Sequence, residues 1–289
     1  MRLLTRKKGE GTYYYLQHSL KKDGKTITKE KYLGTEIPVN LEEIKKKFIT
    51  ELRHDTYRLL EQIKTRFQST WKRTPLSARA RELQEIAIAF TYNTNAIEGS
   101  TITLPETREI IQNDVAPHKP LLDIRETQAH AQVFLSMLKK KEELTANVFL
   151  RWHRTIFRET KPDIAGTFRD YSVSVGSYRA VDWQDIELLI EKLLDVIKKN
   201  QKTMNPVELA GRAHYIFEKI HPFGDGNGRI GRLLIGQILW HARYPMLIIE
   251  RSRRTAYYKA LQRDEEGFVN YFIRRFLAVH KPWLTHKEN

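Results

Sequence analysis

The segment from residue 221 to residue 232, HPFGDGNGRIGR, combines the residue types that phosphate chemistry requires. Glycines within five residues of each other let backbone N–H groups approach an anion closely, and they are Gly224, Gly226 and Gly228. Arg229 and Arg232 stand three residues apart at the start of an expected helix, so both can face the loop and bind phosphate oxygens. The pattern predicts a polyphosphate site.

Two further side chains of this loop can supply a metal ligand and a base. Asp225 places a carboxylate oxygen among cationic groups, which is typical of Mg²⁺ held jointly by one or two carboxylates and substrate phosphates. His221 stands at the mouth of the loop, where a neutral imidazole can take a proton from an incoming hydroxyl. A plain turn with an unrelated histidine is the alternative, but the co-occurrence of these residue types favours a functional site.

Helices must position this loop, because apolar residues recur at helical spacing on both sides of it. The preceding helix is expected over residues 206–220, with Asn205 as N-cap and Pro206 at its first position, and the following apolar run covers 233–242. The same periodicity is present in residues 41–67, 83–93, 105–113, 125–140, 146–158, 183–199 and 266–279. The fold class is therefore mainly α.

Two short segments depart from the helical pattern. Residues 168–178, FRDYSVSVGSY, alternate with period two and end in a glycine turn, which predicts a β-hairpin between helices. Strand-like runs at 13–16 and 27–33 flank the turn sequence KDGK, so a second hairpin is expected near the N-terminus. The expected domains are a small basic β module over 1–38, a helical region over 39–124, and a core with C-terminal helices over 125–289.

Composition narrows the class of protein. With 40% hydrophobic and 29% charged residues, the 289-residue chain is expected to fold. It has no cysteine, which excludes a disulfide framework and a thiol nucleophile and suits the cytoplasm, our expected location. A net charge of +15 raises nucleic acid as a partner, although a solvated basic surface is the favoured interpretation. We expect neither a secretory signal nor a membrane span.

The string of residues 221–232 resembles the signature of the Fic (Fido) family, whose nucleotidyl-transferring members carry HPFx[DE]GNGRxxR. The resemblance extends to GRAHYIFEKIHPF, to the flap-like GTFRDYSVSVGSY and to RRTAYYKAL, and it covers residues 89–277. It implies a Fic/Fido helical core with an inserted β-hairpin flap. It also implies an enzyme that transfers AMP from ATP to a Ser, Thr or Tyr hydroxyl of a target protein.

The resemblance implies a role for each matching residue. His221 would be the general base and Asp225 the Mg²⁺ ligand. Arg229 and Arg232 would hold the β- and γ-phosphates, so that attack on the α-phosphate expels pyrophosphate. The nucleotide would also contact the rest of the loop, the flap turn and two tyrosines, namely Gly226, Asn227, Gly228, Ile230, Gly231, Val175, Gly176, Ser177, Tyr178, Tyr257 and Tyr258. ATP is the default nucleotide, with UTP or another nucleotide as an alternative.

A second motif lies far upstream, because residues 94–99, TNAIEG, resemble the family's inhibitory [ST]xxxE[GN] helix in its N-terminal position. The resemblance implies that Glu98, with Thr94 and Gly99 completing the motif, restrains the enzyme. A carboxylate against Arg232 would occupy the guanidinium that the γ-phosphate needs. The plain alternative is an ordinary helix end followed by a glycine.

Three functional classes stay open. A transferase of AMP to protein leads; the others are a hydrolase that removes AMP from a modified protein, with Glu98 orienting water, and a nucleic-acid-binding regulator. The sequence does not name the target protein, which can be the chain itself. It also does not determine the oligomeric state, for which a homodimer is one option.

Overall fold

The structure, a computed structural model, describes residues 1–22, 25–176 and 178–285 and divides the chain into two compact units. The first is Met1–Gln62 and the second is Ile63–Asn289, so the division lies inside helix α1, Leu41–Arg73. The expected domain boundaries after residues 38 and 124 stay a prediction. Both motifs of the sequence, at 94–99 and 221–232, belong to the second unit.

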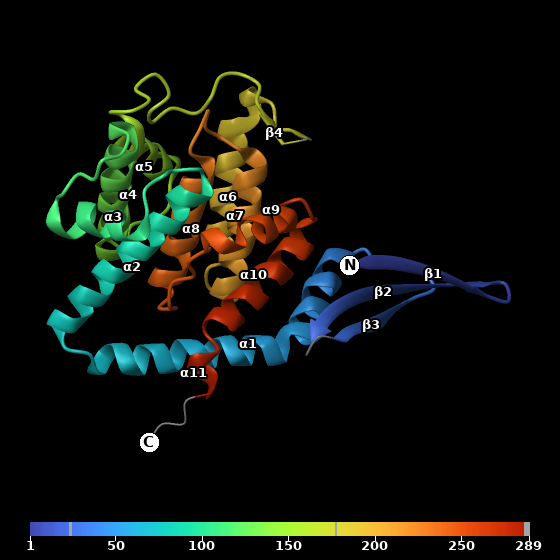
Figure 1. The fold of residues 1–289 in the computed structure, drawn as a ribbon. Coiled ribbons are helices and arrows are strands. Elements are labelled where there is room, and N and C mark those ends of the chain that lie inside the picture. The colour runs from blue at the N-terminus through green and yellow to red at the C-terminus, as the bar shows by residue number, and fades with distance from the viewer. Residues whose placement is uncertain (23–24, 177, 286–289) are drawn as a thin grey trace. The chain divides into compact units, whose positions relative to one another are not determined.

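The first unit begins with a three-stranded antiparallel sheet in the order β1-β2-β3 (Figure 1). Its strands are β1, Arg2–Lys8, β2, Gly11–Lys22, and β3, Lys25–Gly34. The pairing of β2 with β3 confirms the predicted hairpin, whose turn residues 23 and 24 lie outside the described residues. Strand β1 was not predicted, because its two leucines are adjacent and charged residues follow them, which hides any alternation.

The second unit is built from helices with one short β ribbon between them. Its elements after α1 are α2 (Leu76–Ile97), α3 (Leu104–Arg108), the π-helical turn η1 (Glu109–Asn113), α4 (Leu121–Lys139), α5 (Ala146–Phe157), β4 (Ser174–Val175), β5 (Tyr178–Arg179), the 3₁₀ turn η2 (Trp183–Asp185), α6 (Ile186–Asn200), α7 (Pro206–Ile220), α8 (Asn227–His241), the 3₁₀ turn η3 (Arg251–Arg253), α9 (Arg254–Leu261), α10 (Glu265–Val279) and α11 (Pro282–Thr285). The mainly α prediction is confirmed.

Helix ends around the site follow local capping chemistry. Asn205 Oδ1 accepts a hydrogen bond from Val207 N at 2.9 Å, and Pro206 occupies the first turn of α7, as predicted. Helix α8 starts at Asn227, before the apolar run that begins at residue 233. Its first turns contain glycine and arginine, so the apolar periodicity did not mark where the helix begins. The glycine-rich loop between α7 and α8 is therefore short and fixed at both ends.

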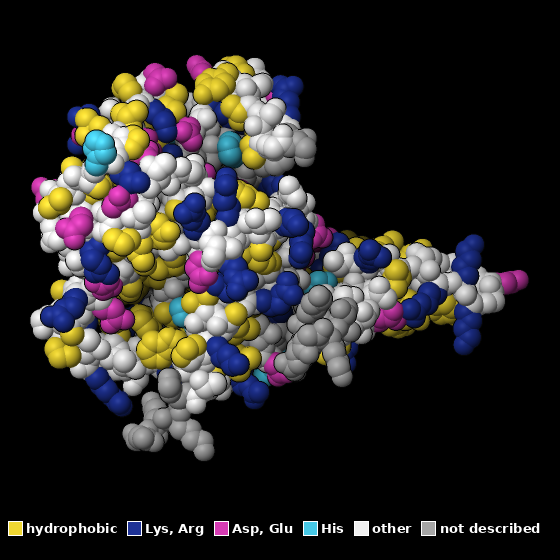
Figure 2. Space-filling model, viewed as in Figure 1, with side chains coloured by type: hydrophobic (Ala, Val, Ile, Leu, Met, Phe, Trp, Pro, Cys, Tyr) yellow, Lys and Arg dark blue, Asp and Glu magenta, His cyan; other side chains and the backbone are white. Residues whose placement is uncertain are grey.

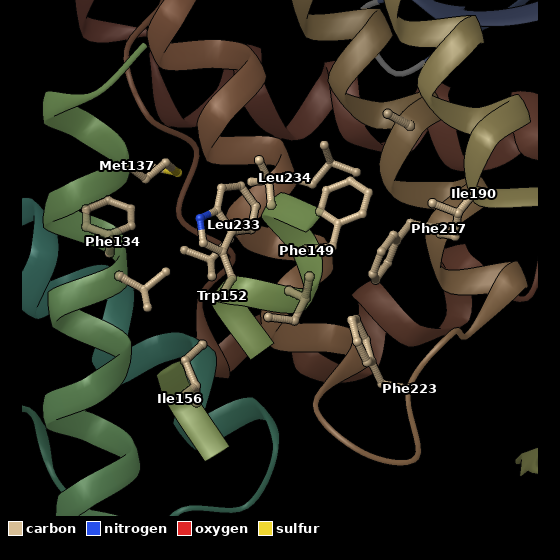
Figure 3. Packing of buried hydrophobic residues seen from close by; sticks show 14 of the residues in the cluster. Phe134, Met137, Phe149, Trp152, Ile156, Ile190, Phe217, Phe223, Leu233 and Leu234 are labelled. Carbon is tan, nitrogen blue, oxygen red and sulfur yellow. The ribbon is translucent and has the colours of Figure 1, made fainter. Parts of the chain in front are cut away.

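Large apolar side chains from α4, α5, α6, α7 and α8 form one core beneath the loop (Figure 3). Phe217 of α7 and Phe149 of α5 are fully buried, with ring centroids 5.4 Å apart. Phe223 of the loop is also fully buried, and Figure 3 shows it directed toward Phe217. Because truncating a buried Phe to Ala costs about 3–5 kcal/mol, Phe223 anchors the loop to the core.

Basic side chains are spread over the surface. In Figure 2, Lys and Arg side chains alternate with acidic and hydrophobic ones on the face shown. Among the described residues, no helix combines the length and apolar character that crossing a membrane requires.

Candidate functional site

The side chain of Asn227 closes the glycine-rich loop. Its Oδ1 accepts a hydrogen bond from Phe223 N at 2.8 Å, and its Nδ2 donates to Phe223 O at 2.8 Å. The Phe223 ring stacks on His153, with centroids 4.0 Å apart. Because the Asn227 amide is engaged in the loop itself, its backbone N–H is the group left for a phosphate.

Helix α8 directs its N-terminus into the loop. Gly226, the residue before its first turn, has a φ of +78°, a left-handed conformation that glycine adopts without strain. A Cβ at Gly226 would lie 2.4 Å from the Phe157 ring, so only glycine fits beside α5. The first N–H groups of a helix lack carbonyl partners within the helix, and its dipole is positive at this end. The backbone therefore forms an anion site.

His221 ends α7 at the mouth of the loop. Its backbone is left-handed, with a φ of +51°, and its N–H donates to Phe217 O at 2.9 Å. Its Nδ1 is buried without a hydrogen-bond partner among the described residues. Burial lowers the pKa of the imidazole, with a smaller contribution from the positive charge of Arg169. His221 is therefore neutral at neutral pH and able to accept a proton.

Asp225 is the carboxylate of the loop, and its side chain is 51% exposed. Its Oδ2 accepts a hydrogen bond from Lys161 Nζ at 2.7 Å. Burial acts to raise the pKa of Asp225, but the hydrogen bond from Lys161 and the charge of Arg229 outweigh it and lower the pKa. The described residues contain no group of three or more acidic or histidine side chains that could hold a metal. One ionised carboxylate fits a Mg²⁺ ion that arrives with substrate phosphates.

A carboxylate from α4 engages Arg229. Arg229 Nη1 donates to Glu126 Oε2, and the guanidinium carbon lies 4.3 Å from the Phe157 ring centroid. Glu126 Oε1 accepts a hydrogen bond from Thr160 Oγ1 at 2.8 Å and lies 3.2 Å from Lys161 Nζ. Burial opposes ionisation of Glu126, but the Arg229 charge prevails, so the pKa is lowered. Arg229 is thus ion-paired in the ligand-free site.

A carboxylate from the end of α2 engages Arg232, which is 2% exposed. Arg232 Nε donates to Thr94 Oγ1 at 2.5 Å, and Nη2 donates to Glu98 Oε1 at 2.5 Å and to Thr94 O at 3.2 Å. Burial acts to lower the pKa of Arg232, but Glu98 more than compensates and raises it. A Cβ at Gly228 would lie 2.3 Å from Glu98 Oε1, so glycine at this position admits the carboxylate. The structure brings Thr94 and Glu98 to Arg232.

The end of α2 explains how Glu98 reaches this position. Glu98 is the C-cap residue, and Gly99 after it has a φ of +101°, which favours glycine. Glu98 N and Ser100 N both donate to Asn95 O at 3.0 Å. Glu98 therefore ends helix α2 in the ordinary way and also contacts Arg232, so the two interpretations of the motif are compatible.

A buried polar cluster lies close to Arg232. Tyr257 is 1% exposed, and its hydroxyl lies 2.7 Å from His214 Nε2. Glu218 Oε1 lies 3.9 Å from the same nitrogen, and burial raises the pKa of Glu218 to about 7. Tyr257, expected at the nucleotide, is enclosed in this cluster, whereas Tyr258 is partly exposed.

The flap is the β4–β5 ribbon, which pairs Ser174 with Arg179 and Val175 with Tyr178. Val175 is partly buried, and Gly176 at the turn is exposed with a φ of +60°. Ser177, expected at the nucleotide, lies outside the described residues. The predicted hairpin is present, but its paired strands are only two residues long.

Arg169, which the sequence interpretation missed, connects the flap segment to the loop. It is 4% exposed, and its Nε donates to His221 O at 2.9 Å. Its Nη1 donates to Tyr171 O and its Nη2 to Val181 O, each at 2.7 Å. Since both ends of the flap and the backbone of His221 share this guanidinium, Arg169 positions one relative to the other.

Two further residues expected at the nucleotide, Ile230 and Gly231, lie near the start of α8. Ile230 is fully buried in the core, and a Cβ at Gly231 would lie 2.7 Å from Glu218 Oε1. The sequence interpretation also missed Glu126 and Lys161, which stand in segments with ordinary helix or turn composition. Their only signal in the sequence is a charged side chain, and 29% of the residues in the chain are charged.

Comparison with known proteins places these features in a family context. Residues 143–239 match the Fic/DOC family. The chain is 34% identical over 200 residues to "Protein adenylyltransferase Fic" of Nematostella vectensis, which covers 67% of the chain and 47% of that relative. It is 34% identical over 212 residues to the protein of the same name from Drosophila ananassae. That match covers 70% of this chain and 41% of that relative. The chain thus spans less than half the length of these curated relatives.

Two solved structures are similar in fold. "Fic-1" from C. elegans matches with a TM-score of 0.71 and 25% identity, covering 85% of this chain and 76% of that one. A Fic domain-containing signaling protein from Bacteroides thetaiotaomicron matches with a TM-score of 0.68 and 24% identity. That match covers 80% of this chain and 100% of the other. The mainly helical architecture described above is shared with both.

Proposed function

We propose that this chain, which carries a Fic/DOC domain over residues 143–239, transfers AMP from ATP to a Ser, Thr or Tyr hydroxyl of a protein. The observation that carries the proposal is the convergence of a neutral His221, an ionised Asp225 and the N-terminus of α8 on one loop. A base, a metal ligand and an anion site are the three requirements of in-line transfer at phosphorus.

His221 would take the proton from the target hydroxyl while its oxygen attacks the α-phosphorus. The bond from the α-phosphorus to the oxygen that bridges to the β-phosphate would break, and pyrophosphate would leave. Arg229, Arg232 and the first N–H groups of α8 would hold the leaving phosphates. Asp225 would hold Mg²⁺, which supplies positive charge to neutralise the phosphate oxygens.

We further propose that Glu98 restrains this reaction. Its carboxylate lies 2.5 Å from Arg232 Nη2, at a guanidinium that a γ-phosphate would otherwise engage. Thr94 supports the same arginine through its hydroxyl. A nucleotide must therefore replace Glu98, or bind without its γ-phosphate engaged by Arg232.

The partners and the location are proposals as well. The proposed target is a protein, with the chain itself as one candidate. A homodimer is one option for the oligomeric state, and the proposed location is the cytoplasm. On the face that Figure 2 shows, basic side chains are dispersed among acidic and hydrophobic ones, which does not favour the nucleic-acid-binding alternative there.

The decisive experiment incubates a Glu98→Gly variant with ATP labelled at the α- or the γ-phosphate. We expect α-label on protein, none from the γ-label, and no transfer after EDTA treatment. Label from the γ-phosphate, or no label on self or on lysate proteins by a folded variant, would overturn the proposal. Release of AMP from a modified protein by the wild type would instead favour the hydrolase that uses Glu98.

A further inference from the structure

The turn after α5 places a lysine directly on the loop carboxylate. Helix α5 ends at Phe157, whose carbonyl accepts hydrogen bonds from Thr160 N at 3.0 Å and Lys161 N at 2.7 Å. These two bonds fix the turn, and the Lys161 ammonium lies 5.0 Å from the Phe157 ring centroid. The side chain is thus positioned by its own turn and by the aromatic ring that also contacts Arg229.

The Lys161 ammonium bridges two carboxylates of different origin. It donates to Asp225 Oδ2 at 2.7 Å, and it lies 3.2 Å from Oε1 of Glu126 on α4. The Lys161 side chain is 33% exposed, whereas that of Glu126 is 13% exposed. The ammonium can therefore leave Asp225 for solvent while Glu126 still offers it an acceptor.

Within the described part of the chain, three cationic side chains around the loop are each paired with a carboxylate. The set is Arg229, Arg232, Lys161, Glu126, Glu98 and Asp225. Within this set, Lys161 is the cation closest to Asp225, because its Nζ lies 2.7 Å from Asp225 Oδ2 whereas Arg229 Nη2 lies 3.9 Å from Asp225 Oδ1. The place that a divalent ion would take beside Asp225 is therefore already next to a positive charge.

We propose that Lys161 is a positioning residue that competes with a divalent cation for Asp225. The inference rests on the proposed role of Asp225 as metal ligand. A metal ion at Oδ2 and an ammonium 2.7 Å from the same oxygen would repel each other, so the metal must displace Lys161. Lys161 thereby holds Asp225 oriented in the ligand-free loop and raises the metal concentration needed to fill the site.

The test measures binding of Mn²⁺ to the full chain by water-proton relaxation enhancement, with inorganic pyrophosphate present to supply phosphate oxygens and with no ATP. Lys161→Met removes the ammonium and should tighten Mn²⁺ binding by about two- to fivefold, the equivalent of a partly exposed ion pair. Lys161→Arg keeps the charge and should bind Mn²⁺ as the wild type does. Lys198→Met removes the same charge from an exposed pair with Glu143 and should also leave binding unchanged.

Unchanged or weaker Mn²⁺ binding by a folded Lys161→Met variant would overturn the inference. So would tighter binding that survives Asp225→Asn in the Lys161→Met background, because the metal would then sit elsewhere, for example at Glu126. Since neither ATP nor a target is present, the result stands apart from the transfer assay. A chain that transfers no AMP can still pass this test, and one that transfers AMP can fail it.

Discussion

Arg229 and Arg232 lie three residues apart on α8, and each pairs with a carboxylate from a different helix, but the two pairs are built differently. Glu98 is the C-cap residue of α2, followed by a glycine, and its side chain is 29% exposed. Glu126 lies inside α4, is 13% exposed, and receives Thr160 and Lys161 besides Arg229.

We infer from this difference that the Glu98–Arg232 pair opens more easily than the Glu126–Arg229 pair. Releasing Glu98 requires a change at one helix end only, where few other contacts depend on the side chain. Releasing Glu126 would uncouple α4, the turn after α5 and the start of α8 together. We therefore expect the Glu98 pair to control activity and the Glu126 pair to control the stability of the site.

The largest effect is expected at His221, which belongs to neither pair. The loss of AMP transfer on its replacement is the reference for the changes expected at the two pairs. His221→Ala should reduce AMP transfer by about 10²- to 10⁴-fold, because a general base is lost. Nucleotide affinity, measured by calorimetry, should stay near that of the wild type. Transfer at the wild-type rate would contradict the assignment of the base.

Opening the Glu98–Arg232 pair should raise activity. Glu98→Gly frees Arg232 for the γ-phosphate, and we expect self-modification from α-labelled ATP to rise by about 5- to 150-fold, the usual range of coupling between sites. Adding Arg232→Ala should abolish the gain, since the freed partner is removed. Equal labelling of the wild type and a folded Glu98→Gly variant would falsify the proposed restraint.

Breaking the buried pair should instead destabilise the protein. Glu126→Gln keeps the shape but removes the charge partner of Arg229 and leaves Lys161 with Asp225 alone, so the free energy of unfolding should fall by about 1–3 kcal/mol. Urea denaturation measures it. The matched control is Glu143→Gln, from an exposed pair with Lys198, with an expected loss below about 0.5 kcal/mol. Similar losses in both variants would show that the Glu126 junction does not hold the site.

The smallest effect concerns Glu218, whose raised pKa depends partly on Glu98. Burial is the main cause of the raised value of about 7, and the negative charge of Glu98 adds to it, so Glu98→Gly should lower the pKa of Glu218. Infrared spectroscopy of the protonated carboxyl band, with Glu218→Gln as the control, measures this titration. An unchanged midpoint would show that the two carboxylates are not coupled through the site.

The carboxyl group of Glu218 also makes the free energy of unfolding depend on pH. Since its pKa is raised on folding, Glu218 contributes stability that is complete below its unfolded value of 4.5 and is lost as pH rises through about 7. Glu218→Gln should remove this part of the pH dependence.

Local patterns predicted most of the helices, both hairpins and the glycine-rich loop, because periodicity and caps depend on neighbouring residues, but they missed α9 and α11 and the first turns of α2. The resemblance pointed to Thr94 and Glu98, and the structure brings them to Arg232 across more than 130 positions of sequence. Glu126, Lys161 and Arg169 were missed because their partners come from other elements, which composition does not reveal. Tyr257 was expected at the nucleotide, but its pairing with His214 depends on the packing of α7 against α9.

Gly228 has an evolutionary consequence. A methyl group there would lie 2.3 Å from Glu98 Oε1 and 2.9 Å from Arg232 Nη1, so any larger residue must displace one of them. The same volume is the place proposed for the γ-phosphate, so a larger residue at Gly228 would loosen the restraint and obstruct the nucleotide together. Selection against such a residue would then follow from the proposed chemistry and from the proposed restraint alike, and no single change at Gly228 would yield a hyperactive allele.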